Sequence, residues 1–395
     1  MIKRNDVFTR LSSNYLFPQI QACKDEFLKS NPGVKLINLG IGDTTVPLSN
    51  ELTDKVKEYV EGLNQNQFYS GYGPEQGIVA LREKIANTFY NDLINPEEIF
   101  ISDGAKCDIG RLQILLGPYC VIGVQDPTYP VYVDGSILQG VREIKYIPCI
   151  PENNFFPPIK DLPNVDVLYL CSPNNPTGTA LTRQQLQDIV NWAIQTKTLL
   201  VYDAAYASFI QDPQTPKSIY EIDGSKLVAI EINSFSKMAG FTGIRLGWSV
   251  VPKHLLYDNG LCLWQDWKRT VCTIFNGASN IAQAAGLALL EENIFHCMNK
   301  TISYYLENTN ILKSAILHTE IEVYGGRDAP YLWIRNKRIS SWNYFHYFLN
   351  EYHLITTPGI GFGSSGENFL RLSAFGKRED VLEAAKKLSF QAQLA

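Results

Sequence analysis

The 395-residue sequence lacks the segments by which proteins commonly bind a membrane, a metal ion or a nucleic acid. No uncharged apolar stretch is long enough to span a bilayer, and residues 1–6 lead into no apolar signal core. The eight cysteines include no C-x-x-C pair and the five histidines show no metal-ligand spacing, so we expect reduced cysteines and no metal. A net charge of −5 without a long basic run argues against nucleic-acid binding.

One lysine is flanked by hydroxyl groups, in the segment Ser234-Phe235-Ser236-Lys237, and a Gly-Ile-Arg-Leu-Gly-Trp segment follows at residues 243–248. The lysine amine can form a Schiff base with an aldehyde, while the serines and Arg245 can bind a phosphate dianion. The glycines allow close approach of the backbone to a ligand. These residues together predict a site for pyridoxal phosphate, a phosphorylated aldehyde.

Polar residues follow two buried-strand patterns upstream of this lysine. Asp203 ends the apolar run at residues 199–202, and Asn175 follows the run at 165–171 in a turn with two prolines. Ligands of open α/β sheets bind beyond the carboxyl ends of strands, so both side chains can reach a cofactor there. A protonated pyridine nitrogen supplies the partner that a buried acid needs, and the asparagine amide can reach a ring hydroxyl.

Two more strand patterns, at residues 99–102 and 121–126, end in loops suited to the same ligand. Gly104 opens a predicted helix whose first amides, from Ala105 and Lys106, can bind phosphate. Tyr129 can stack its aromatic face on a pyridine ring. Each residue alone also fits an ordinary turn, a helix cap or a packed side chain, whereas their shared position at strand ends favours one cofactor cleft.

A different glycine pattern, Gly361-Phe362-Gly363-Ser364-Ser365-Gly366, matches the G-x-G-x-x-G of dinucleotide-binding proteins. That motif must open a helix, but the residues that follow here, 369–372, have a strand pattern. We therefore interpret the match as accidental.

The ordered set SPNNPTG, YDAAY, SFSK, GIRLGW and FLRLS resembles the class I and II aminotransferases, which are pyridoxal phosphate enzymes of fold type I. The resemblance covers nearly the whole chain. Within that family, the segments at residues 12–17, 39–45, 71–77, 275–279 and 357–363 are similar to those of LL-diaminopimelate aminotransferases. Because the pattern begins at residue 12, it leaves no room for a transit peptide, and we expect a cytoplasmic protein.

The resemblance implies a role for each matching residue. Lys237 would be the catalytic residue, forming the Schiff base and moving the proton at the substrate Cα. Asp203 would pair with the ring nitrogen, and Tyr206 and Asn175 would contact the ring oxygen. Further cofactor contacts would come from Tyr72 of a second subunit, Ala105, Lys106, Tyr129, Ser234, Ser236, Arg245 and Asn276. Arg371, among apolar neighbours, would bind the substrate α-carboxylate through its planar fork.

Diaminopimelate carries a second ammonium and a second carboxylate, so its distal pocket must be polar. The resemblance places Tyr15, Gly42, Glu75, Lys106, Tyr129 and Asn276 there, beside the substrate contacts of Asn175 and Arg371. Tyr15, Glu75 and Asn276 would come from the neighbouring subunit of a homodimer. Glu75 is the natural partner of the distal ammonium, while Lys106 and Asn276 can donate hydrogen bonds to the distal carboxylate.

Strand and helix patterns alternate from about residue 95 to 250, which predicts a large α/β domain with a mostly parallel sheet. By resemblance to aspartate aminotransferase, this sheet would have seven strands, one of them antiparallel, in a three-layer α/β/α arrangement. Residues 46–289 would form this cofactor-binding domain and 290–395 a smaller α+β domain, which residues 1–45 would join as an arm. Residues 340–354 predict an amphipathic helix of the smaller domain.

The activity implied is ping-pong transamination between LL-diaminopimelate and 2-oxoglutarate, giving tetrahydrodipicolinate and glutamate. In reverse, the reaction would supply diaminopimelate for lysine and cell-wall synthesis. An aromatic or aspartate aminotransferase is the first alternative, and a pyridoxal phosphate-dependent β-lyase acting on sulfur amino acids is the second. A regulatory module fused to a DNA-binding domain is disfavoured, because the chain has no room for an amino-terminal helix-turn-helix.

Overall fold

A seven-stranded sheet in the order β2-β8-β7-β6-β5-β3-β4 is the centre of the computed structural model, which describes residues 2–11 and 16–391. Its strands are β2 (Ile99–Ser102), β3 (Ile122–Asp126), β4 (Ile144–Pro148), β5 (Val167–Cys171), β6 (Leu199–Asp203), β7 (Ala229–Ser234) and β8 (Gly247–Val250). Only β8 runs antiparallel to its neighbours, β2 and β7. The predicted mostly parallel sheet of seven strands is confirmed.

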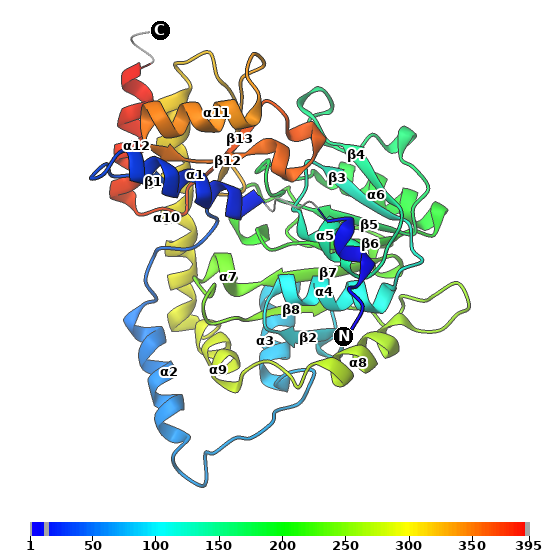
Figure 1. Ribbon diagram of the computed structural model, residues 1–395. Helices are drawn as coiled ribbons and strands as arrows, with labels where there is room; N and C mark the ends of the chain where they lie inside the picture. The colour runs from blue at the N-terminus through cyan, green and yellow to red at the C-terminus, as the bar shows by residue number, and fades with distance from the viewer. Residues whose placement is uncertain (1, 12–15, 392–395) are drawn as a thin grey trace.

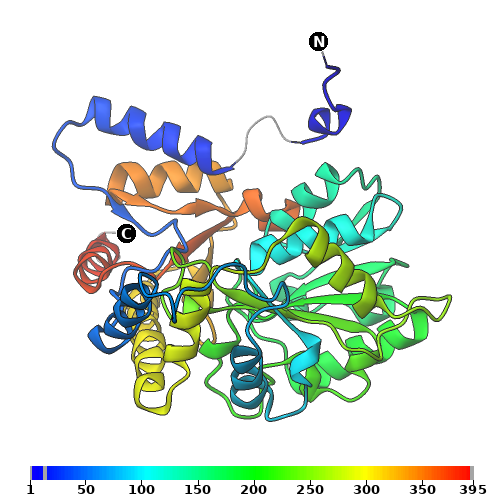
Figure 2. The same cartoon turned by 90° about the horizontal axis from the view of Figure 1, so that it is seen from below.

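Helices cover both faces of this sheet, so the large part of the molecule has three layers (Figure 1, Figure 2). One face carries α4 (Ala105–Leu116), α5 (Val131–Leu138) and α8 (Leu263–Ile274), and the other carries α3 (Val79–Tyr90), α6 (Arg183–Thr196) and α9 (Asn280–Leu289), with α2 (Asn50–Gly62) against α9. Strand residues alternate between the two cores: Leu168 and Leu170 point to one, Val167 and Tyr169 to the other. Burial on both faces explains why these strands read as continuous apolar runs.

A second, four-stranded antiparallel sheet has the order β12-β13-β10-β9. Its strands are β9 (Glu322–Gly325), β10 (Tyr331–Arg335), β12 (Thr357–Pro358) and β13 (Phe369–Ser373), and beside it β1 (Ile37–Asn38) pairs in parallel with β11 (Leu354–Ile355). The surrounding helices are α1 (Leu16–Ser30), α10 (Glu292–Ile316), α11 (Ser341–Tyr347) and α12 (Arg378–Gln391) (Figure 1). The amino-terminal α1 and β1 thus lie with the carboxyl-terminal elements.

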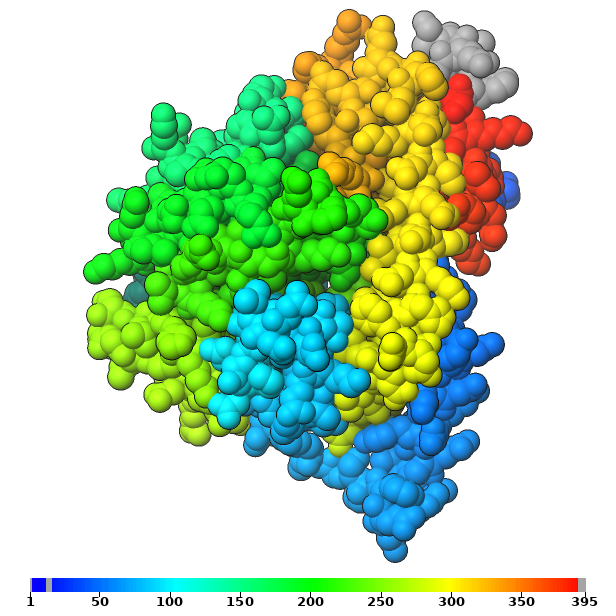
Figure 3. Space-filling view, turned by 180° about the vertical axis from the view of Figure 1, so that it is seen from behind, coloured from blue at the N-terminus to red at the C-terminus, as the bar shows by residue number. Residues whose placement is uncertain are grey.

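The long helix α10 connects the two parts of the molecule. Its first half, including Ile294 and Met298, belongs to the core of the large sheet, whereas Leu312 and Ile316 belong to the core of the second sheet. Figure 3 shows this helix in yellow along the outer face, between the green and cyan elements and the red α12. Because one helix takes part in both cores, the domain limits at residues 45 and 289 stay predictions.

The predicted amphipathic helix at residues 340–354 is present, in two segments. α11 continues into a π-helical turn at Phe348–Tyr352, and His353 ends it with a left-handed φ of +57°. Phe345, Phe348 and Leu349 are buried in the core of the second sheet, as their spacing predicts.

No helix in the described part of the chain is long and apolar enough to cross a membrane. The same residues contain no cluster of three or more histidine, cysteine, aspartate or glutamate side chains that could hold a metal ion.

Candidate active site

The carboxyl ends of β2, β3, β5, β6 and β7 lie at one edge of the large sheet, and predicted site residues follow them. Asp203 and Ser234 are the last residues of their strands, while Tyr129 and Asn175 lie in the loops that follow β3 and β5. The antiparallel strand β8 begins at this edge, because Gly247 pairs with both Ser102 and Ser234, and it brings Arg245 there too.

A cavity of about 640 Å³ opens at this edge, between the two sheets. The predicted site residues that line it are Gly42, Ala105, Lys106, Tyr129, Asn175, Asp203, Tyr206, Ser234, Ser236, Lys237, Arg245 and Arg371. Most of the predicted set is therefore brought together within one chain.

Lys237 presents its amine to this cavity from the short helix α7 (Phe235–Met238), directly after β7. The amine donates a hydrogen bond to the carbonyl oxygen of Gly42. Burial lowers the pKa of Lys237 to about 8, against the attraction of Asp43 and with further lowering by Arg371 and Arg245. A lysine with this pKa is partly neutral near physiological pH, which a nucleophilic amine requires.

An anion site lies beside Lys237, where the amino terminus of α4 meets Ser234, Ser236 and Arg245. The backbone conformations here are those that allow close approach. Gly104 has φ of +124°, and a Cβ on it would lie 2.6 Å from Nη2 of Arg245, which itself adopts φ of +66°. Ser234 Oγ donates to Ser236 Oγ at 2.8 Å, so both hydroxyls are held together. Helix amides, hydroxyls and a guanidinium together suit a phosphate group.

Asp203 also lines the cavity and is 6% exposed. It accepts hydrogen bonds from Tyr132 Oη at 2.7 Å and from the Ala205 amide at 3.0 Å. Burial raises the pKa of Asp203, and the hydrogen bonds from Tyr132 and Ala205 oppose the rise. A cation beside this carboxylate would favour its ionised form, so the position suits a protonated ring nitrogen.

Arg371 enters the cavity from β13 of the second sheet and is 3% exposed. Its Nη1 donates to Asn175 Oδ1 at 2.7 Å, and its Nη2 donates to the Gly40 carbonyl at 2.6 Å. The guanidinium carbon lies 4.7 Å from the centre of the Tyr331 ring and 5.0 Å from that of Phe362. A buried arginine held in this way can bind a carboxylate in a defined plane.

The family model described as aminotransferase class I and II matches residues 34–388. The chain belongs to the class I and II aminotransferases. It is 50% identical over 98% of its length to an LL-diaminopimelate aminotransferase of Protochlamydia amoebophila (strain UWE25), of which 97% is covered. A chloroplastic enzyme of the same name from Arabidopsis thaliana is 46% identical, with 98% of this chain and 86% of that protein covered.

Among solved structures, the aminotransferase is similar to the L,L-diaminopimelate aminotransferase of Chlamydomonas reinhardtii, with a TM-score of 0.94, 48% identity and 98% of each chain covered. The predicted α/β fold class, the family and the enzyme class are thereby confirmed.

Three of the predicted residues do not line the cavity of their own chain. Tyr72 is 90% exposed, and Glu75 and Asn276 are also exposed. Their loops touch, because a Cβ on Gly277 would lie 3.1 Å from the Pro74 carbonyl oxygen. This exposed position is compatible with contacts to a second subunit of the aminotransferase, which stay a prediction. The fourth residue expected from that subunit, Tyr15, lies outside the described residues.

Several residues of the aminotransferase site were missed by the sequence analysis. Tyr132 binds Asp203, and Tyr331 Oη lies 2.7 Å from Tyr206 Oη. Asp43 and Thr242 also line the cavity. Asp43 lies within the family-like segment at 39–45, which was a usable signal, and Tyr132 comes three residues after Tyr129. Tyr331 carries no local signal, because it enters the site from the second sheet.

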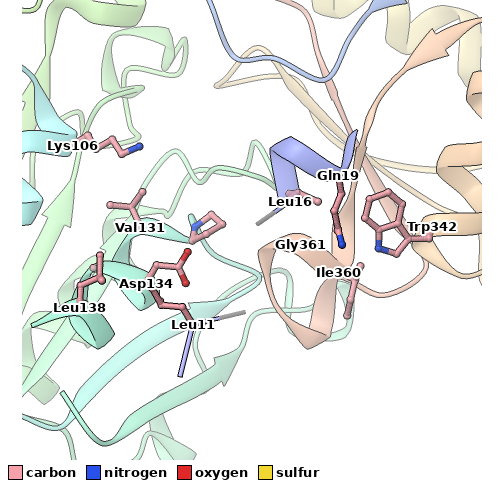
Figure 4. A pocket seen from close by; sticks show the side chains of 12 residues that line it. Leu11, Leu16, Gln19, Lys106, Val131, Asp134, Leu138, Trp342, Ile360 and Gly361 are labelled. Carbon is pink, nitrogen blue, oxygen red and sulfur yellow. The ribbon is translucent and has the colours of Figure 1, made fainter. Parts of the chain in front are cut away.

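A second cavity, of about 730 Å³, neighbours the first and shares Lys106 with it. Figure 4 shows Val131, Asp134 and Leu138 of α5 on one wall, and Ile360, Gly361 and Trp342 across from them. This cavity contains neither Lys237 nor Asp203, so we assign the chemistry to the smaller one.

Proposed function

We propose that this aminotransferase uses pyridoxal phosphate to transfer an amino group between LL-diaminopimelate and 2-oxoglutarate. The observation that carries the proposal is one cavity lined by the half-buried Lys237, by the anion site at α4 and by the carboxylate of Asp203. The cofactor has a phosphate, an aldehyde and a basic ring nitrogen, and the three groups match these three positions. When bound, it supplies an electron sink for the charge left at the substrate Cα.

The chain's own residues would bind the substrate and move its proton. Arg371 would bind the α-carboxylate, and its contact with Asn175 would keep that carboxylate next to the ring. Burial lowers the pKa of Lys237 to about 8. Its amine would take the proton from the substrate Cα and deliver it to the aldehyde carbon of the cofactor. Tyr206 and Asn175 would contact the ring oxygen, and Tyr129 the ring face.

The substrate assignment is supported by the relatives of 46% and 50% identity, whose names specify LL-diaminopimelate. In our proposal, the distal end of the substrate contacts Gly42, Lys106 and Tyr129 of one subunit, and Tyr15, Glu75 and Asn276 of its neighbour. The enzyme would therefore act as a homodimer. A glutamate carboxylate is the partner that a distal ammonium requires.

The visible spectrum of the purified protein tests cofactor and substrate together. We expect an absorption band of bound pyridoxal phosphate that is lost on addition of LL-diaminopimelate and returns on addition of 2-oxoglutarate. The meso isomer, aspartate and phenylalanine are the comparison substrates. A band that responds to aspartate or phenylalanine instead would support aminotransferase activity but exclude LL-diaminopimelate as the substrate. Absence of the band would contradict the binding of pyridoxal phosphate.

A further inference from the structure

A buried carboxylate joins the large sheet to the second sheet next to the site. Asp126, the last residue of β3, is 2% exposed. Its Oδ2 accepts hydrogen bonds from Ser364 Oγ at 2.8 Å, Ser365 Oγ at 3.0 Å and the Ser365 amide at 3.1 Å. Two residues further on, the Thr128 amide donates to the Phe362 carbonyl at 2.8 Å. The loop after β3 and the turn at residues 362–365 are thus held against each other.

This turn is part of the Gly361–Gly366 segment that matches the dinucleotide motif in the sequence. Two 3₁₀ turns, Gly359–Phe362 and Ser364–Gly366, lead into strand β13 rather than into a helix. Gly363 has φ of +131°, and a side chain on it would collide with Oδ1 of Asp126. The glycine and the two serines therefore shape the turn around a carboxylate of the same chain.

A residue of the proposed ligand site lies on each side of this contact. Tyr129 follows Thr128 and lines the cavity. On the other side, the Phe362 ring is 2% exposed and lies 5.0 Å from the guanidinium carbon of Arg371. Because an aromatic face attracts a guanidinium and limits its orientation, the plane of Arg371 depends on where Phe362 is held.

We propose that Asp126, Ser364 and Ser365 form a latch that positions Arg371 for the α-carboxylate of every substrate. Asp126 acts as a positioning residue: its effect on Arg371 passes through the turn and Phe362. Three donors compensate for the burial of its charge, which gives the contact a preferred geometry. The inference rests on the proposed function, in which Arg371 binds that carboxylate.

A weakened latch and a weakened distal pocket should change the KM values of the two substrates differently. The α-carboxylate is common to LL-diaminopimelate and 2-oxoglutarate, so a weakened latch raises the KM of both by similar factors. A change at Glu75 should instead affect LL-diaminopimelate alone. A role in stability only would lower the unfolding temperature and leave both KM values unchanged.

The test uses the holoenzyme with Ser364→Ala and Ser365→Ala combined, which removes two of the donors and leaves Asp126 in place. We expect KM for both substrates to rise about tenfold, with kcat changed less than about threefold, because hydrogen bonds to a charged group are lost. Calorimetric titration with glutarate, a dicarboxylate that cannot react, should show a similar loss of affinity. Glu152→Gln is the matched control, since Glu152, in the 3₁₀ turn that follows β4, pairs with Arg335 of β10 at 3.2 Å.

Unchanged KM values and glutarate affinity in a folded double variant would overturn the latch, as would a change confined to LL-diaminopimelate. If the double variant does not fold, Ser365→Ala and Asp126→Asn are judged by the same criteria. If the wild-type enzyme does not turn over LL-diaminopimelate, the proposed substrate is wrong. Glutarate binding to the variants then tests the positioning role of the latch independently of that substrate.

Discussion

The guanidinium of Arg371 donates a hydrogen bond to Oδ1 of Asn175 at 2.7 Å, although 196 residues separate them in the sequence. Arg371 comes from β13 of the second sheet, and Asn175 comes from the turn after β5 of the large sheet. In the proposed function one residue binds the substrate α-carboxylate and the other contacts the cofactor ring. Under that proposal, their hydrogen bond would hold the two binding groups next to each other before either ligand binds.

Arg371→Lys should lower kcat/KM for LL-diaminopimelate and for 2-oxoglutarate by about 100-fold or more, because lysine cannot reproduce the planar fork. Steady-state kinetics with each substrate in turn checks this. Arg335→Lys, four residues after Tyr331 on β10, is the control and should change neither value by more than about threefold. A similarly small effect of Arg371→Lys would remove the α-carboxylate role from Arg371.

Lys237→Ala should abolish turnover and leave the fold intact, because the variant loses the amine that would form the Schiff base and move the proton at the substrate Cα. Circular dichroism checks the fold, and product formation over many equivalents checks the turnover. Lys226→Ala is the control, because Lys226 is half-buried outside the cavity, where its amine donates to the Leu93 carbonyl. A Lys237 variant that still turned over many times would contradict the assignment.

The contribution of Lys237 to the stability of the cofactor-free protein should rise with pH between about 8 and the ordinary lysine value of 10.5, because burial lowers the pKa of Lys237 to about 8. In this window the unfolded chain binds a proton that the folded chain does not, so raising the pH favours the folded state. The full effect is at most about 3.4 kcal/mol. Urea unfolding at several pH values measures it, and the difference from Lys237→Met isolates the lysine. Equal pH slopes in both proteins would show that Lys237 has no lowered pKa.

Tyr132→Phe should weaken pyridoxal phosphate binding about tenfold, because Asp203 loses the 2.7 Å hydrogen bond that stabilises its ionised form. Fluorescence titration of the cofactor-free protein measures the dissociation constant. Tyr169→Phe is a matched control, since its ring stacks on Tyr132 at 5.0 Å while its hydroxyl does not bind Asp203. The same affinity in Tyr132→Phe and wild type would mean that Asp203 does not depend on this hydroxyl.

Glu75→Gln should raise KM for LL-diaminopimelate about tenfold or more, because the distal ammonium would lose its charged partner. KM for 2-oxoglutarate should stay within about twofold, since that substrate has no distal ammonium. Gln76 is an unsuitable control, because its side chain holds the loop to the Glu97 and Ile99 carbonyls. Glu58→Gln on the exposed face of α2 serves instead. Undiminished use of LL-diaminopimelate would favour a broader aminotransferase.

The local motifs of the site could be predicted from the sequence because their physics is local. Apolar runs that end in polar residues identified the ends of β2, β3, β5 and β6, and glycine at position 104 identified the start of α4. The chemistry of Lys237 and Arg245 followed from side-chain type and spacing. The domain limits and the contributions of Tyr72, Glu75 and Asn276 stay predictions, because they depend on packing between parts of the molecule or between subunits.

The sequence by itself determined the mostly parallel α/β sheet and the residues at its strand ends, since hydrophobic periodicity and turn chemistry operate over a few residues. Its ordered motifs determined the family, through their resemblance to the class I and II aminotransferases. Only the tertiary structure decided which side chains meet across long separations. Tyr132 and Asp203 are 71 residues apart, Tyr206 and Tyr331 are 125 apart, and Asp126 and Ser364 are 238 apart. The first pair joins a helix and a strand of the large sheet, and the other two join the strand ends and loops of the large sheet to the second sheet's side of the molecule, so the geometry of the site is a property of the folded core.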